Sequence, residues 1–265
     1  MKKYSYLLFL ILYSCTNNFQ LQEGDFLFQD LDSSPLCDAI ELVTPGYNQG
    51  NFSHIGLIIY DSLKPKVLEA IPPKVTLTEL DIFLNRSEDD NANPKVIVGR
   101  LKKEYKCAIP EAIKFAQKRI GVDYDNNFII NNNQYYCSEL LYEMFLRYSI
   151  FSLQPMTFLN PDTGDTIPAW KDHYAKLGIK IPQNQLGINP GSMSLSNKID
   201  IDHIYGTPDG MSKKIHITKD EAAEFYKEHQ SKPFYNDLCA YLSSLPIVVM
   251  ILEGENAVLG NRKLM

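Results

Sequence analysis

The sequence predicts an α+β fold. Three runs rich in Ile, Leu and Val have the length and composition of buried strands, and they span Phe52–Tyr60, Val67–Ala70 and Lys95–Leu101. Two later segments, Glu111–Ile120 and Cys137–Tyr148, carry apolar residues at helical spacing. Strands and helices in this order indicate a domain of the α+β class.

The composition is that of a folded, mildly acidic protein. Of 265 residues, 45 % are apolar and 22 % are charged, which is ordinary globular usage. One large domain or two small ones is the expectation at this length. The formal net charge is −6, and the sequence has no basic stripe, so no nucleic-acid partner is expected.

The other elements of the first half follow from strand and turn signals. Gly24 and Asp25 precede the apolar Phe26–Phe28, which predicts the start of a buried strand. Ser33–Leu42 has a Ser/Pro start and predicts a short helix, whereas Val75–Leu84 mixes strand with short-helix signals. Loops rich in Gly, Asn or charge are expected at Tyr47–Asn51, Arg86–Pro94 and Asp123–Asn133.

The second half is less regular. Phe151–Gly210 is rich in Pro, Gly, Asn and Asp, so it is expected to wrap around the first domain, with a short helix near Pro168–Leu177. Beyond it, Thr218 and Glu221 have the spacing of a capping box at the start of a helix that runs to His229. A further helix is expected at Phe234–Leu242, and short strands at 215–217 and 246–252.

The first 14 residues are typical of a secretory signal peptide. Lys2 and Lys3 precede an apolar run, Tyr6–Tyr13, that is too short to span a bilayer. Ser14-Cys15 follows, and this junction resembles the lipobox of bacterial lipoproteins. The resemblance implies cleavage before Cys15, lipid attachment to that residue, and a membrane-anchored protein of the bacterial cell envelope. The alternative is a plain signal peptide or a short buried strand.

Three residues have contexts that suit catalysis. His54 stands near the start of a buried strand, Glu69 lies inside a short apolar strand, and Cys137 opens an apolar helix. A buried carboxylate needs a partner, which a neighbouring imidazole would supply. A thiol at a helix N-terminus is favoured as thiolate, and an imidazole would complete the pair that cysteine hydrolases use. Each feature alone fits a structural residue, but together they favour a functional site.

These features belong to a longer series of motifs. The series resembles the permuted NlpC-type cysteine hydrolases, also called YiiX-like or permuted papain-like amidases, over about residues 24–148. The resemblance implies a small antiparallel sheet or open barrel packed on helices, in a domain that we bound at 15–210. The motifs are Gly24-Asp25, Ser53-His54-Ile55-Gly56, Leu68-Glu69-Ala70, Tyr124-Asp125 and Tyr136-Cys137-Ser138-Glu139-Leu140.

The resemblance also implies roles for five residues. Cys137 would attack a carbonyl, His54 would carry the proton, and Glu69 would orient the imidazole, as the third member of a triad does. The backbone N–H of Cys137 would donate to the oxyanion. Tyr124 and Glu139 are candidate substrate-binding residues, although Glu139 would equally suit the first turn of a helix. No metal ion and no cofactor are expected.

Cys37, Cys107 and Cys239 are expected to be small buried side chains. Their spacing is not that of a zinc site or of a compact disulfide framework.

The C-terminal residues 211–265 show a second resemblance. The runs Lys219–Tyr226, Lys232–Tyr235 and Val249–Val258 resemble an internal piece of nucleoside diphosphate kinases, which implies a small α/β fragment of ferredoxin-like type. The family's catalytic segment would begin after Met265, and neither His216 nor His229 lies in the catalytic motif. No kinase activity is therefore expected.

The leading hypothesis is a cysteine hydrolase of the bacterial envelope that forms a thioester. Its substrate would be a peptidoglycan stem peptide or a lipid-linked amide or ester, and acyl transfer to another acceptor would use the same intermediate. The alternatives are a catalytically silent binding lipoprotein of the same fold and, third, a nucleoside diphosphate phosphotransferase.

Overall fold

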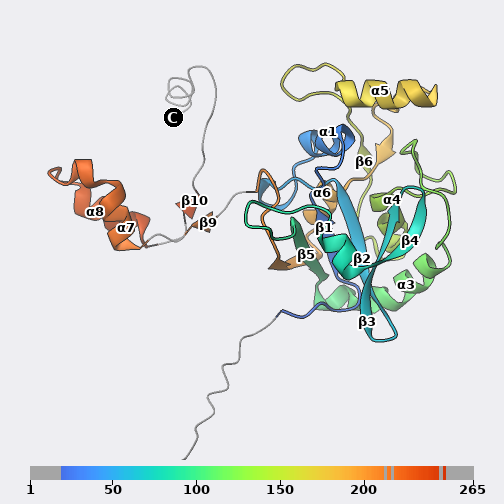
Figure 1. Cartoon of the computed structure of the whole chain (residues 1–265), viewed down its shortest axis with the longest axis horizontal. Coiled ribbons are helices and arrows are strands. Elements are labelled where there is room, and N and C mark those ends of the chain that lie inside the picture. Colours follow the sequence, from blue (N-terminus) through green and yellow to red (C-terminus); the bar gives the residue numbers. More distant parts are fainter. Residues whose placement is uncertain (1–18, 212–213, 216–217, 245–246, 249–265) are drawn as a thin grey trace, which may run out of the picture.

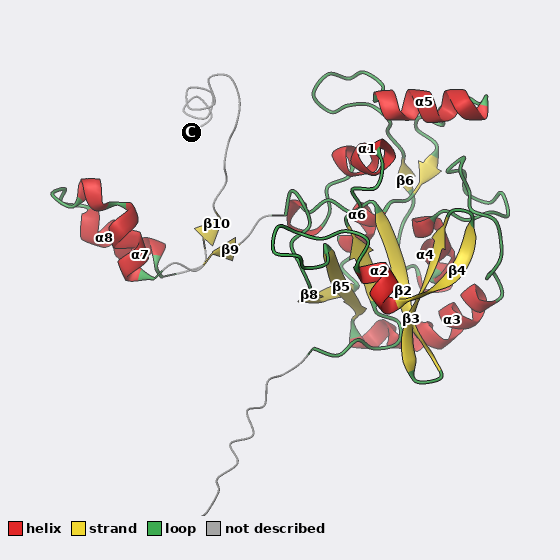
Figure 2. Ribbon diagram, viewed as in Figure 1, coloured by secondary structure: helices red, strands yellow, loops and turns green. Residues whose placement is uncertain are grey.

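The computed structural model describes residues 19–211, 214–215, 218–244 and 247–248. Its centre is a six-stranded sheet in the order β4-β3-β2-β1-β5-β8, in which every neighbouring pair is antiparallel. Figure 1 shows the sheet with its helices, and Figure 2 distinguishes strands from helices by colour. The strands are β1 Phe26–Gln29, β2 His54–Asp61, β3 Lys64–Ile71, β4 Lys74–Glu79, β5 Val96–Leu101 and β8 Ile199–Ile204.

Helices cover the sheet because its strands are apolar on both faces. On one face, alternate residues such as Phe26, Leu57 and Leu68 join the main core, against which α3 and α4 pack. On the other face, Leu27 and Val67 pack with Phe83 of α2. The helices are α1 Pro35–Val43, α2 Leu80–Leu84, α3 Ile109–Gln117, α4 Cys137–Met144, α5 Pro168–Leu177 and α6 Pro190–Ser194.

Helices α1 and α5 form a separate small core at one end of the sheet (Figure 1). Ala39 of α1 packs with Trp170 and Tyr174 of α5, and Phe158 and Ile167 complete the cluster. A two-stranded ribbon of β6 Gln154–Pro155 and β7 Leu186–Gly187 connects this unit to the rest of the domain. Phe158 and Trp170 of this small core also line a cavity that Cys137 and His54 share.

Most predicted elements are present, with several differences. The helix expected to run to His229 ends earlier, because α7 spans Lys219–Phe225 and a separate 3₁₀ turn follows it. Helix α3 ends at Gln117 and not at Ile120, and α4 ends at Met144, after which Leu146–Tyr148 is a 3₁₀ turn. The region 151–210 does more than wrap around the domain, because its residues 199–204 form the edge strand β8 beside β5. Of the three cysteines expected to be buried, Cys239 is buried, Cys37 is partly exposed, and Cys107 is exposed because it lies in the 3₁₀ turn Lys103–Ala108.

The described C-terminal elements are α7 Lys219–Phe225, a 3₁₀ turn Lys227–His229, α8 Tyr235–Leu242 and a ribbon of β9 Lys214–Ile215 with β10 Ile247–Val248. The predicted capping box is present, because Oγ1 of Thr218 accepts from the N–H of Glu221 at 3.2 Å and Oε2 of Glu221 accepts from the N–H of Thr218 at 2.7 Å. The remaining residues of the strands expected at 215–217 and 246–252 lie outside the described residues.

The N-terminal segment with Cys15 also lies outside the described residues. In the part of the chain that the structure describes, none of the helices has the length and apolar character that crossing a bilayer requires.

Candidate active site

His54 and Glu69 come from neighbouring strands. His54 is the first residue of β2, and Glu69 lies in β3. The register pairs Leu57 with Leu68, which brings Glu69 level with Gly56, the second residue after His54. The two side chains therefore project from the same face of the sheet on adjacent strands. Nε2 of His54 lies 2.6 Å from Oε2 of Glu69.

Gly56 leaves room beside the imidazole. A Cβ atom at this position would lie 2.3 Å from Cγ1 of Val67 and 3.3 Å from Cε2 of Phe83. The Phe83 ring centroid is 5.8 Å from that of His54. A larger residue at position 56 would therefore displace the side chains that pack beside His54, which explains a glycine inside an otherwise apolar strand.

Two further side chains hold the Glu69 carboxylate. Arg86 donates from Nη1 to Oε2 at 2.8 Å and from Nη2 to Oε1 at 2.6 Å, which is the bidentate arrangement that a guanidinium forms with a carboxylate. Oγ1 of Thr78, on the adjacent strand β4, donates to Oε1. The side chain of Glu69 is completely buried, so these donors and His54 offset the free-energy cost of burying its charge.

The neighbours of Glu69 and His54 determine the protonation states of these two residues. Burial raises the pKa of Glu69, but hydrogen bonds from Arg86 and His54 outweigh burial and lower it to about 2. Burial lowers the pKa of His54, but hydrogen bonds with Cys137 and Glu69 outweigh that effect and raise it to about 9. At neutral pH the carboxylate is ionised and the imidazole is protonated.

Cys137 is the first residue of α4, and Tyr136 is the N-cap. Its backbone N–H therefore has no acceptor within the helix, and the helix N-terminus favours a negative charge on the sulfur. Sγ lies 3.9 Å from the carbonyl oxygen of Ser53. The thiol lies close enough to the His54 ring to raise its pKa, and since Nε2 of that ring faces Glu69, Nδ1 is the atom left to face the sulfur.

A cavity of about 370 Å³ is lined by both Cys137 and His54. Its volume is that of a small-ligand pocket. Asp, Glu, Lys and Arg do not occur among the described residues that line it. Much of the wall is apolar and comes from α1, α5 and the segments between them: Leu36, Ile40, Val43, Phe128, Phe158 and Trp170.

Tyr124 lines the same cavity. Burial raises the pKa of Tyr124 well above its ordinary value, and the neighbouring Cys137 thiol adds to this effect. The phenol is therefore a protonated O–H donor close to the thiol. Its ring packs edge-on against Phe128, with centroids 6.5 Å apart.

Hydrogen bonds connect one wall of the cavity directly to the start of α4. Oγ of Ser138 donates to the carbonyl oxygen of Ile188 at 2.9 Å, and the N–H of Ile188 donates to the hydroxyl of Tyr136 at 3.3 Å. Ile188 is thus bound by the residues on both sides of Cys137. The segment around Ile188 therefore keeps a fixed position relative to the thiol.

Glu139 does not line this cavity. Its side chain is buried in the first turn of α4, and Oε1 accepts from the N–H of Asn131 at 3.1 Å. Burial raises its pKa to about 8. Glu139 was expected either to face the substrate or to lie in the first turn of a helix. The structure has it in the first turn of α4, where its side chain points towards the loop that contains Asn131.

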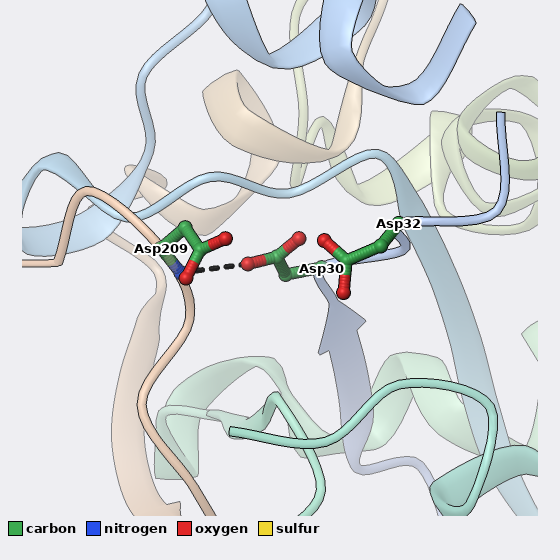
Figure 3. Close-up of side chains that lie close together, drawn as sticks. All are labelled: Asp30, Asp32 and Asp209. Atoms are coloured by element: carbon green, nitrogen blue, oxygen red, sulfur yellow. Dashed lines mark hydrogen bonds between the residues drawn. The ribbon is translucent and has the colours of Figure 1, made fainter. Parts of the chain in front are cut away.

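A cluster of three carboxylates lies outside the cavity and is drawn in Figure 3. Asp30, Asp32 and Asp209 approach one another within 4.8 Å. Nζ of Lys95 lies 2.9 Å from Asp32, 2.9 Å from Asp209 and 3.6 Å from Asp30. The ammonium group already provides the cluster with a cation, so its chemistry is that of an ion-pair network and does not call for a metal ion.

The sequence motifs identified Cys137, His54, Glu69 and Tyr124, all of which meet at one site. They did not identify Arg86 or Thr78, which hold Glu69. Arg86 was expected only as part of a charged loop, and Thr78 lies in a segment of mixed signals. A buried carboxylate in β3 was the one hint that such partners existed.

Comparison with known proteins agrees with this geometry. Residues 20–201 match the profile of the permuted papain-like amidase enzymes, YaeF/YiiX, C92 family. The chain belongs to this family. The predicted fold class is therefore confirmed. The family is one of amidases, which are hydrolase-type enzymes.

A solved structure shares the YiiX-like fold. The crystal structure of the metalloprotein YiiX from Escherichia coli O157:H7 superimposes with a TM-score of 0.58 at 22 % sequence identity, over 71 % of this chain and 99 % of that one. The term metalloprotein describes that protein. At this identity the similarity shows the fold alone.

Residues 210–265 match the profile of nucleoside diphosphate kinases. Over 53 residues the chain is 58 % identical to the enzyme of Nitratiruptor sp. and spans 39 % of its length. Over 53 residues it is 53 % identical to the enzyme of Ruegeria pomeroyi and spans 38 % of that length. The C-terminal segment thus resembles a part of these kinases, as predicted.

Proposed function

We propose that the domain hydrolyses an amide or ester through a thioester on Cys137. The observation that carries this proposal is the chain of contacts from Glu69 to His54 to Cys137, with the thiol at a helix N-terminus in the wall of an apolar cavity. A thiolate paired with an imidazolium is the activated form of a cysteine nucleophile.

In the first half of the reaction, the Cys137 thiolate attacks the substrate carbonyl carbon. The carbonyl oxygen becomes an oxyanion, which the N–H of Cys137 and the phenol of Tyr124 stabilise. The imidazolium of His54 then gives its Nδ1 proton to the leaving nitrogen or oxygen as the C–N or C–O bond breaks. An amine or alcohol leaves, and the acyl group remains on Sγ as a thioester.

In the second half, water replaces the leaving group. Neutral His54 removes a proton from water, and the resulting hydroxide attacks the thioester carbonyl. The C–S bond breaks, the acid is released, and the thiolate–imidazolium pair is restored. Glu69 keeps the imidazole in one orientation throughout, because it holds Nε2. An acceptor other than water would give acyl transfer through the same thioester.

The cavity supports an apolar acyl group as the substrate portion next to the thiol. A peptidoglycan stem peptide carries free carboxylates and an amine, which lose hydration on binding and need opposite charges. The described lining residues include no acidic and no basic side chain other than histidine. An apolar acyl chain would instead gain free energy from burial against Ile40, Phe158 and Trp170.

We also propose that the protein is anchored in the bacterial envelope by a lipid on Cys15. The support is the sequence before Cys15, a short apolar run after two lysines. Such an anchor would hold the enzyme near lipid-linked substrates.

Intact-mass spectrometry tests the proposed reaction. The purified protein is mixed with 4-nitrophenyl esters of increasing acyl length and with a synthetic stem peptide, quenched in acid, and digested to locate adducts. We expect an acyl adduct on Cys137 that forms faster with long chains than with acetate and that is missing in Cys137→Ala. No adduct at any chain length would contradict the hydrolase, whereas faster cleavage of the stem peptide would contradict the apolar substrate.

A further inference from the structure

Arg86 is a charged residue that reaches the active site without lining the cavity. Its two terminal nitrogens bind both oxygens of Glu69, at 2.8 and 2.6 Å. The Glu69 side chain has no exposed surface, while that of Arg86 is 20 % exposed. The guanidinium therefore binds Glu69, the residue of the proposed triad that lies farthest from the cavity.

The chain around Arg86 is fixed at several points. Arg86 follows α2, and its guanidinium carbon lies 5.1 Å from the centroid of the Phe83 ring. The centroid of the same ring lies 5.8 Å from that of the His54 imidazole. The carbonyl oxygen of Phe83 accepts from Nε2 of Gln29 at 2.7 Å, and Gln29 is the residue of β1 that pairs with His54. Phe83 and Gln29 therefore contact or pair with residues on both sides, and they hold Arg86 and His54 in fixed relative positions.

Besides orienting Glu69, the positive charge of Arg86 offsets the negative charge of that carboxylate. Without a cation on its far side, Glu69 would present a full buried negative charge to His54 and would attract the imidazolium proton strongly. With Arg86 in place, the carboxylate and guanidinium together carry no net charge. The ionisable groups that face His54 are Cys137 from α4 and Glu69 from β3, and Tyr124 faces the thiol from the loop before α4.

We propose that Arg86 is a positioning residue, which fixes the Glu69 carboxylate by two hydrogen bonds and offsets its charge, so that His54 faces Cys137 and keeps a transferable proton. This inference rests on the proposed thiol hydrolase. It predicts the direction in which the His54 pKa changes when Arg86 is replaced. Loss of the guanidinium removes a positive charge near the imidazolium, so the His54 pKa rises and proton transfer to the leaving group becomes less favourable.

The test is an NMR titration of the histidine ring signals in the full chain, from pH 5 to 11, together with turnover of the acyl ester that the wild type cleaves best. The His54 signal is assigned by its loss in His54→Gln. The variants are Arg86→Gln, Arg86→Lys and Thr78→Val. Arg86→Lys keeps the positive charge but loses the bidentate pair of hydrogen bonds. Thr78→Val removes an uncharged donor to the same carboxylate and keeps the side-chain shape.

For Arg86→Gln we expect a rise of about 0.5–1 pH unit in the His54 pKa and a loss of about 10- to 100-fold in turnover from misplacement of the imidazole. For Arg86→Lys we expect a His54 pKa close to wild type with a partial loss of turnover, and for Thr78→Val a much smaller change in both. Each variant's folded fraction is measured by the fluorescence of Trp170, the one tryptophan of the chain.

Two outcomes would overturn the inference. If Arg86→Gln loses turnover only in proportion to its folded fraction, with the His54 pKa unchanged, Arg86 supports the fold alone. If the His54 pKa falls, the electrostatic argument has the wrong sign. A wild-type His54 that titrates near its ordinary value of 6.5 would instead contradict the thiolate–imidazolium pair itself, and with it the proposed function.

Discussion

Nε2 of His54 lies 2.6 Å from Oε2 of Glu69, and the two side chains are 6 % and 0 % exposed. The contact joins the first residue of β2 to the middle of β3, so it depends on the register of the sheet. It leaves one ring nitrogen free for the thiol of Cys137. This geometry places the charge of a buried carboxylate in the candidate active site.

Replacing Glu69 with Gln should lower kcat/KM by about 10²- to 10⁴-fold, since the amide neither stabilises an imidazolium nor fixes the ring tautomer. The matched control is Glu79→Gln, an exposed glutamate on β4 that pairs with Lys66 and has no contact with the site. Steady-state kinetics with one acyl ester compares the two variants. Equal activity of Glu69→Gln and wild type would remove Glu69 from the mechanism.

Replacing Tyr124 with Phe keeps the ring against Phe128 but removes the phenol O–H. We expect turnover to fall by about 10²- to 10³-fold, as for loss of one oxyanion donor. Alkylation of Cys137 by iodoacetamide should stay unchanged, because that displacement forms no oxyanion. If alkylation and turnover fall together, Tyr124 affects the thiol and not the oxyanion.

The cavity predicts a change in chain-length preference. Ile40 of α1 lines it, whereas Leu42 of the same helix is 44 % exposed and does not. Ile40→Trp should fill part of the cavity and lower kcat/KM for the longest esters by about tenfold or more, with little effect on acetate. Leu42→Trp is the control and should leave the preference unchanged. An identical profile for both variants would mean that the acyl chain binds elsewhere.

Stability should vary with pH through the same pair. The pKa of His54 is raised from 6.5 to about 9 in the folded protein, so its contribution is fully present below pH 6.5 and is lost as pH rises through 9. The pKa of Glu69 is lowered from 4.5 to about 2, so its contribution is present above pH 4.5 and is lost as pH falls towards 2.

Urea unfolding, followed by the fluorescence of Trp170, measures this dependence. The free energy of unfolding of the wild type relative to His54→Gln should be largest between about pH 5 and 6 and should decrease towards pH 9.5. The difference between the two proteins removes the contribution of titrating groups that do not interact with His54, and the pH range above 5 avoids the titration of Glu69. A difference that grows with rising pH would contradict a raised His54 pKa.

The sequence supported the order of strands and helices better than their ends. Apolar runs predicted β2, β3 and β5, because buried strands are continuous in Ile, Leu and Val. Strand β8 was missed, although Ile199, Ile201 and His203 alternate with Asp200 and Asp202 in the manner of a half-exposed strand. Its surroundings are rich in Pro and Gly, and its pairing with β5 is made across about 100 residues of chain, which local signals do not report.

The candidate site was predictable where its residues carry a motif and unpredictable where its residues contact the site only through another side chain. Cys137 and His54 stand in distinctive local contexts, and Glu69 is conspicuous as a charge in an apolar strand. Arg86 stands among other charged and polar residues, and only the folding of β3 against the turn after α2 brings it to Glu69. The position of Glu139 was left open because the first turn of a helix has both an inner and an outer face.

The central claim is that Cys137 is an activated thiolate, and its most direct test is labelling with an iodoacetamide probe across pH. Wild type is compared with Cys137→Ala and His54→Ala, and the labelled residue is located by peptide mass spectrometry. The account predicts rapid labelling of Cys137 well below pH 8 that is lost in both variants. Labelling that begins only near the free-thiol pKa of about 8.5, or that persists without Cys137, would contradict the account.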